Sequence, residues 1–93
     1  MAWAQPIADL ILASVHAIQR DEPGAALLTE RALTGFEGAG LLAFAMAARR
    51  RLGELRGGDV GSNLVAEANG WFRSEGVAKP DRMTAMLAPG FHD

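Results

Sequence analysis

The chain contains no cysteine and no tyrosine, and its aromatic residues amount to only 6% of 93 positions. The absence of cysteine excludes disulfides and thiolate metal sites, and it favours a cytoplasmic location. Apolar residues make up 49% of the chain, so we expect a core of alanine, leucine, isoleucine, valine and methionine. Alanine favours helices and lets their axes approach closely, so the composition predicts a helical protein.

The sequence also lacks an excess of positive charge and a long apolar run. A net charge of -2 provides no field that would attract nucleic acid or an anionic membrane. The most apolar stretch, residues 7–18, is interrupted by Asp9, Ser14 and His16 and is shorter than the roughly 20 residues of a membrane span. No basic segment or cleavage pattern marks a signal peptide. We therefore expect neither nucleic acid nor a membrane as partner.

No sustained alternation of β-branched and polar residues predicts a strand, so the expected elements are helices. Pro6 suits the first turn of a helix that continues to about residue 20, and Pro23 suits the start of a second that ends near Phe36. The first helix is apolar on almost every side and needs cover from two directions. Its predicted solvent-facing strip comprises Asp9, Ala13, His16 and Arg20.

Apolar spacing predicts a third helix over 41–55 and a fourth that ends near residue 75. Asp59 or Ser62 is the expected cap of the fourth helix. A short last helix over 81–87 is followed by the tail APGFHD. The predicted fold is therefore all-α, with four to five antiparallel helices in one domain, residues 1–93: a hairpin over 6–36, a hairpin over 41–75, and a capping helix with tail over 79–93.

Helix pairs joined by short turns suggest a helical repeat. The tetratricopeptide repeat has a period of about 34 residues, with a Leu-Gly step in its first helix and A-x3-F before a proline in its second. The second predicted pair has Leu52-Gly53 at the first pattern and Ala68, Phe72 and Pro80 at the other. The first pair matches less closely.

Residues 47–91 resemble the C-terminal ends of tetratricopeptide-like regions in large bacterial proteins, notably myxobacterial serine/threonine kinases and ATPase regulators. The best-matching positions are Arg51 to Leu55, Gly57-Gly58, Ala68, Trp71, Gly76-Val77, Pro80, Arg82-Met83 and Leu87 to Gly90. This resemblance implies that the chain consists of the last helical hairpins of such a region and a capping helix. It would then be either a piece of a larger regulatory protein or a short relative of one. Kinase activity is not implied, because the chain contains no kinase or nucleotide-binding motif.

The glycine-rich stretch LGELRGGDVG, residues 52–61, could in principle cradle a phosphate. It lacks the lysine and the spacing of a phosphate-binding loop, and it follows no predicted strand. We expect it to turn the chain between two helices, with glycine supplying positive φ at a helix end.

Metal binding and acid-base catalysis have little support. His16, His92, Asp9 and Asp93 do not show the i, i+3 or i, i+4 spacing of helical metal ligands, and His16 is expected at a helix interface, half-buried. The acidic side chains are expected on solvated outer faces, without a catalytic set: Asp9, Glu30, Glu54, Glu67 and Glu75. We expect no enzyme activity and no cofactor.

Arg49, Arg50 and Arg51 could grip a phosphate or an acidic peptide. Arginines near a helix C-terminus more often complement the helix dipole and pair with surface carboxylates, here Glu54 or Glu67. We expect the surface role.

Trp71 and Phe72 are adjacent and cannot share one helix face. We expect Phe72 in the core and Trp71 against Met83 and Met86, with a binding role for Trp71 as the alternative.

The predicted function is a non-catalytic protein-protein interaction or scaffold module, with a stand-alone helical adaptor or inhibitor as the alternative. The expected partner is a second copy, a neighbouring repeat or a peptide. Ile11→Asp is expected to weaken association more than Glu67→Ala. The candidate interface residues are Trp3, Ile7, Leu10, Ile11, Leu12 and Trp71.

Overall fold

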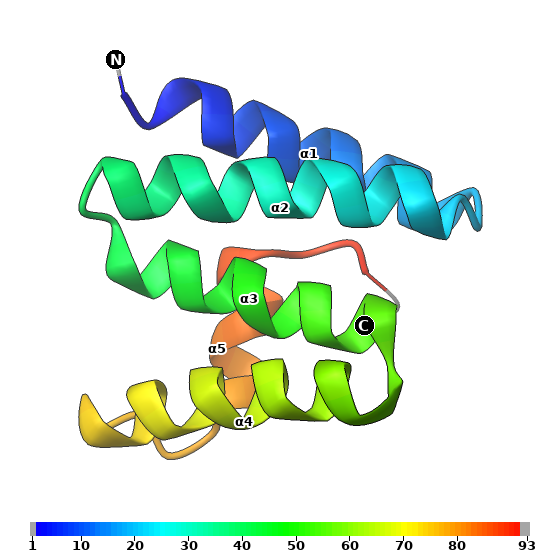
Figure 1. Ribbon diagram of the computed structural model, residues 1–93. Coiled ribbons are helices and arrows are strands. Elements are labelled where there is room, and N and C mark those ends of the chain that lie inside the picture. The colour runs from blue at the N-terminus through cyan, green and yellow to red at the C-terminus, as the bar shows by residue number, and fades with distance from the viewer. Residues whose placement is uncertain (1, 92–93) are drawn as a thin grey trace.

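The computed structural model describes residues 2–91, and this part of the chain is all-α (Figure 1). Its helices are α1 (Ala4–Ile18), α2 (Glu22–Gly38), α3 (Leu42–Arg56), α4 (Gly58–Ser74) and α5 (Pro80–Leu87). Helices α1 to α4 run alternately in opposite directions and stack side by side, while α5 packs against α3 and α4 (Figure 1). The overall extents of 34 × 33 × 20 Å reflect this layered arrangement. The predicted fold class is confirmed.

The turn that ends α1 and begins α2 is organised around Asp21. Arg20 adopts a positive φ of 62°, which ends α1, and Asp21 is the N-cap of α2. The Asp21 carboxylate accepts a hydrogen bond from the backbone N–H of Gly24 at 3.1 Å and shares one with His16 Nδ1 at 2.7 Å. His16 is half-buried at this turn, as predicted. One side chain therefore links the end of α1 to the start of α2.

The pKa of the Asp21 carboxyl is lowered, first by the hydrogen bond with His16 and then by the one from Gly24. Because its folded pKa lies below the unfolded value, the stability that it contributes is present above the unfolded pKa and is lost as the pH falls through the folded pKa. Asp21→Asn is therefore expected to reduce stability at pH 7 and to flatten the loss of stability in acid. Urea unfolding at a series of pH values measures this, with Asp59→Asn in the first turn of α4 as control.

The core contains alanine, leucine and phenylalanine. Within residues 2–91, the buried apolar side chains are those of alanine, leucine and phenylalanine together with Pro6 and Pro80, and Phe36 and Phe72 are among the largest that are fully enclosed. The rings of Phe36 and Phe44 stack with centroids 5.3 Å apart. Isoleucine, valine and methionine, which were also predicted in the core, contribute only partly buried side chains that pack against it, such as Ile7, Val77 and Met83. The inward position of Phe72 is confirmed. Alanine brings the helices close, and leucine and phenylalanine fill the remaining space.

The glycine-rich segment joins α3 to α4 through Gly57 alone, whose φ of 64° and ψ of -169° reverse the chain. The predicted cap at Asp59 or Ser62 is wrong, because the chain re-enters a helix at Gly58 and both residues lie inside α4. Gly53 and Gly61 have a different role: a Cβ on Gly53 would lie 2.6 Å from the Gly61 carbonyl oxygen, and a Cβ on Gly61 would clash with the Gly53 carbonyl. These glycines let the two helices touch backbone to backbone.

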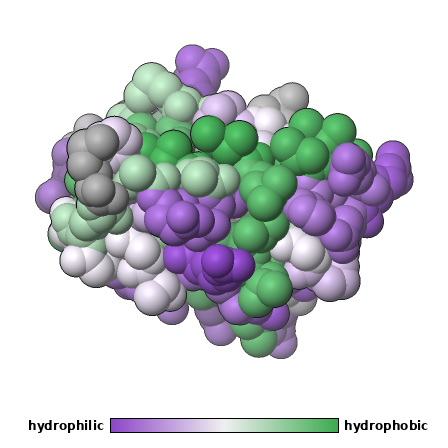
Figure 2. All heavy atoms as spheres, turned by 90° about the horizontal axis from the view of Figure 1, so that it is seen from above, coloured by the Kyte–Doolittle hydropathy of each residue, from purple (hydrophilic) through white to green (hydrophobic). Residues whose placement is uncertain are grey.

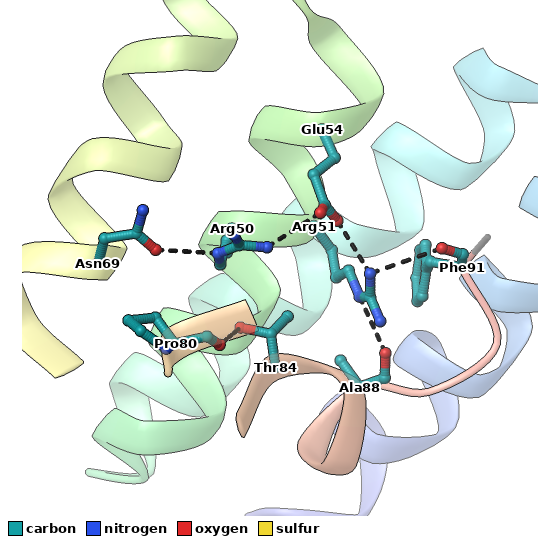
Figure 3. A network of polar contacts seen from close by, with 8 residues as sticks. All are labelled: Arg50, Arg51, Glu54, Asn69, Pro80, Thr84, Ala88 and Phe91. Carbon is teal, nitrogen blue, oxygen red and sulfur yellow. Dashed lines mark hydrogen bonds and ion pairs between the residues drawn. The ribbon is translucent and has the colours of Figure 1, made fainter. Parts of the chain in front are cut away.

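The segment after α5 is packed against the domain and is not a free tail. Residues 88–91, here called the C-terminal strap, run back across the face of the layer (Figure 1). Ala88 and Phe91 are buried, and Arg51 Nε donates a hydrogen bond to the Ala88 carbonyl at 2.9 Å (Figure 3). The Arg51 guanidinium also lies over the Phe91 ring, 5.2 Å from its centroid. The strap therefore belongs to the fold; His92 and Asp93 lie outside the described residues.

Candidate interaction surface

The inward face of α1 is more polar than the sequence pattern predicts. Its buried residues are Pro6, Asp9, Leu10, Ala13 and Ala17. The prediction that Asp9 and Ala13 face solvent is therefore wrong: Asp9 is only 6% exposed and accepts a hydrogen bond from Gln5 at 2.9 Å. The small side chains of Ala13 and Ala17 allow α1 to lie close to α2, and Leu10 is the one large aliphatic side chain of α1 that is buried.

The opposite side of α1, which we call the outward face, consists of apolar residues. Ile11 and Ile18 are 62% and 66% exposed, and Leu12 and Val15 are exposed beside them. At about 100° per residue, the outward face covers an arc of roughly 120°. It comprises Ala4, Ala8, Ile11, Leu12, Val15 and Ile18. Figure 2 looks down on this side of the molecule and shows apolar surface across its middle, with polar residues beside it.

Charged side chains do not interrupt this face. Asp9 and His16 are the ionisable side chains of α1, all of whose residues the structure describes; Asp9 is buried and His16 pairs with Asp21. The exposed sides of α2 and α4, by contrast, carry charges such as Arg31 and Glu67. A surface helix normally presents its polar side to water, whereas α1 presents an apolar side to water and buries its one carboxylate.

The predicted interface residues divide into three groups. Ile11, Leu12 and Trp3 are exposed on or next to α1, as an interface requires. Leu10 is buried and Ile7 is half-buried, so Leu10 supports the surface from beneath and does not form it.

Trp71 is half-buried on α4, at the far side of the helix layer from α1, and its ring meets that of Phe72 edge to face at 5.4 Å. Met86, which Trp71 was expected to cover, is left exposed. The sequence reasoning did not include Val15 and Ile18 among the interface residues, although their i+4 and i+7 spacing from Ile11 places all three on one side of the helix.

An apolar groove lies along one flank of the outward face. It has a volume of about 450 Å³ and is bordered by α1, α3, the end of α5 and the C-terminal strap. Its lining residues are Ile7, Leu10, Ile11, Ser14, Phe44, Leu87, Pro89 and Gly90, with no charged side chain among them. Because Ile11 belongs to both, the groove and the outward face form one continuous apolar surface.

Comparison with family models, curated proteins and solved structures finds no match to this chain. The outward face and its groove are therefore the observations on which a function can be argued.

The three consecutive arginines are engaged within the domain. Arg49 pairs with Glu37 and Glu67, each at 3.2 Å. Arg50 bonds Asn69 at 2.9 Å and pairs with Glu54 at 3.0 Å (Figure 3). The predicted pairing with Glu54 and Glu67 is confirmed.

Arg51 departs from the expected surface role, because it is 3% exposed and holds the C-terminal strap. It also pairs with Glu54 at 2.9 Å. A site that grips phosphate with this arginine would have to compete with its structural contacts.

The remaining chemical possibilities gain no support from the geometry. Over residues 2–91, no group of three or more His, Cys, Asp or Glu side chains is arranged to hold a metal ion. No helix in the same range has the length and apolarity needed to cross a membrane. The candidate ligands His92 and Asp93 lie outside the described residues. Glu30, Glu54, Glu67 and Glu75 are exposed or half-exposed, as expected.

Proposed function

We propose that this protein is a non-catalytic protein-protein interaction module and that the outward face of α1 is its contact surface. The observation that carries this proposal is the uninterrupted apolar arc from Ala4 to Ile18 on the solvent side of a terminal helix. Helices that are apolar all round are buried in stable assemblies, and large exposed apolar patches mark interaction sites. Among the described residues, each other helix exposes only one large apolar side chain: Leu27, Leu42, Val60 and Met86.

The arrangement of the helices supports a tetratricopeptide-like scaffold. In such proteins consecutive helical hairpins stack, and a terminal hairpin that lacks a polar outer face needs a further contact. Here α1 and α2 form one hairpin, α3 and α4 form the next, and α5 packs on the second hairpin (Figure 1). The resemblance of residues 47–91 to bacterial regulatory proteins and the absence of cysteine support a role in the bacterial cytoplasm.

A photo-crosslinking amino acid placed at Ile11 tests this function in the native host. Val60 on α4 is the matched control position, because it is 64% exposed compared with 62% for Ile11. We expect a discrete protein adduct from position 11 and only diffuse background from position 60. Equal labelling from the two positions would show that the outward face is not a contact surface.

A further inference from the structure

We propose that the outward face of α1 binds the same face of a second copy, with the two helices antiparallel about a two-fold axis at Ile11. The proposal rests on the proposed function, because it names the partner of that surface. Three features carry it: the order of small and large side chains along α1, the absence of charge on the face, and the groove on its flank.

Side-chain size changes along the outward face. Ala4 and Ala8 form its first half, Ile11 and Leu12 lie at the middle, and Val15 and Ile18 form its second half. An antiparallel contact centred on Ile11 places Ala4 opposite Ile18 of the second copy, and Ala8 opposite the turn that carries Val15. At both ends of the contact a large side chain then meets a small one, while at the axis Ile11 packs against Ile11 of the second copy, so the two helices can approach evenly along their length.

A parallel contact would give a poorer fit. It would place Ile18 against Ile18 and Ala4 against Ala4, so that the helices were forced apart at one end and left a gap at the other. Gaps forfeit dispersion contacts, whereas matched large and small positions retain them. A two-fold contact of either direction is closed and self-complementary, as homodimer interfaces usually are, so the fit of the side chains decides for the antiparallel one.

The charge distribution is compatible with self-association. A chain of net charge -2 would be repelled by its copy if acidic side chains met at the contact. On α1, Asp9 is buried against Gln5, and His16 is held by Asp21. The outward face is therefore neutral, so that no like charges are brought together.

The flanking groove enlarges the contact. Rotation about this two-fold axis keeps the corresponding flanks of the two helices on the same side. The groove of one copy therefore lies beside the groove of the other, and the apolar walls formed by Phe44 and Leu87 face a shared space. This extends the contact beyond a single helix toward the roughly 800 Å² per partner of a standard interface.

Single cysteines test the antiparallel geometry, because an introduced thiol is the only one in the chain. Ile11→Cys is expected to give a disulfide-linked dimer on mild oxidation, since the two copies of position 11 meet at the axis. Ile18→Cys alone should remain unlinked, because the two copies of position 18 would lie roughly 21 Å apart along the helices and a disulfide needs Cα atoms within about 7 Å. A mixture of Ala4→Cys and Ile18→Cys should link. Self-linking of Ile18→Cys would show a parallel contact and overturn the proposed geometry.

The association itself is measured on the purified wild-type chain by sedimentation equilibrium over a dilution series. We expect a monomer-dimer equilibrium, a dissociation constant raised at least about 100-fold by Ile11→Asp, and a change within twofold for the equally exposed control Val60→Asp. Circular dichroism confirms that both variants are folded.

A wild-type chain that stays monomeric up to millimolar concentration would overturn self-association. If position 11 nevertheless gives a discrete adduct with a different protein in the host, the interaction function stands and only the identity of the partner is wrong. If both experiments are negative, both proposals fail.

Discussion

Gly61→Ala is expected to destabilise the domain by about 2 kcal/mol, although alanine is intrinsically the better helix former. A Cβ at position 61 would clash with the carbonyl oxygen of Gly53, a backbone atom on α3 that no rotamer change can move. The substitution would force α3 and α4 apart along their length and loosen Leu52 and Phe72 in the core. Urea denaturation followed by circular dichroism measures the loss.

Gly70→Ala is the matched control, since it makes the same substitution in the same helix. Beyond the adjoining backbone of α4, a Cβ at Gly70 would meet no heavy atom within 4 Å, so only helix propensity changes. We expect this variant to be more stable than the wild type by about 0.5–1 kcal/mol. The contrast in sign isolates the helix contact: if both substitutions stabilise the protein, the close approach of Gly53 and Gly61 does not determine how α3 packs on α4.

Many of the helix ends are determined by short local sequence signals. Asp21 caps α2 and Pro23 occupies its first turn, while Gly40 adopts a positive φ between α2 and α3. Each signal acts within a few residues, so the sequence alone predicts where these helices begin and end. Arg20 shows the limit of such reasoning, since it adopts the left-handed conformation without glycine's freedom and is held there by the hydrogen bonds that close the turn.

The orientation of α1 could not be predicted from periodicity. A helix that is apolar on nearly all sides has no unique inward face, and polarity alone suggested that Asp9 faces solvent. The structure instead buries Asp9 and Ala13 against α2 and exposes Ile11. The deciding factor is close packing against α2, where Gly35 receives Pro6, and this depends on residues far away in the sequence.

The sequence therefore predicts only part of the candidate surface. The apolar excess of α1 predicted that the helix needs a second contact, and it identified Ile11 and Leu12. The groove on its flank combines α1 with Phe44 and Pro89, which are brought together only by the tertiary fold. The same holds for Arg51 and Phe91, whose contact spans 40 positions and follows no local pattern.

Arg51→Ala is expected to destabilise the domain by about 3 kcal/mol and to release the C-terminal strap. The substitution removes the donor to the Ala88 carbonyl, the pairing with Glu54 and the stacking on Phe91, all at a nearly fully buried position (Figure 3). Buried carbonyls left without a donor lose their hydrogen bonds without gaining water. Urea denaturation measures the stability, and the rate of chymotrypsin cleavage after Phe91 reports on the strap.

Arg50→Ala separates this effect from the general loss of an arginine. Arg50 neighbours Arg51 on α3 and pairs with the same Glu54, but its other partner is Asn69 on α4 and not the strap. We expect it to cost less than about 1 kcal/mol and to leave cleavage after Phe91 unchanged, because ion pairs near the surface contribute little. Equal cleavage rates in the two variants would mean that Arg51 does not hold the strap. If only Arg51→Ala exposes the strap to cleavage, then one buried arginine holds the part of the groove beside α1 that the strap forms. The same variant should in that case also weaken association through α1.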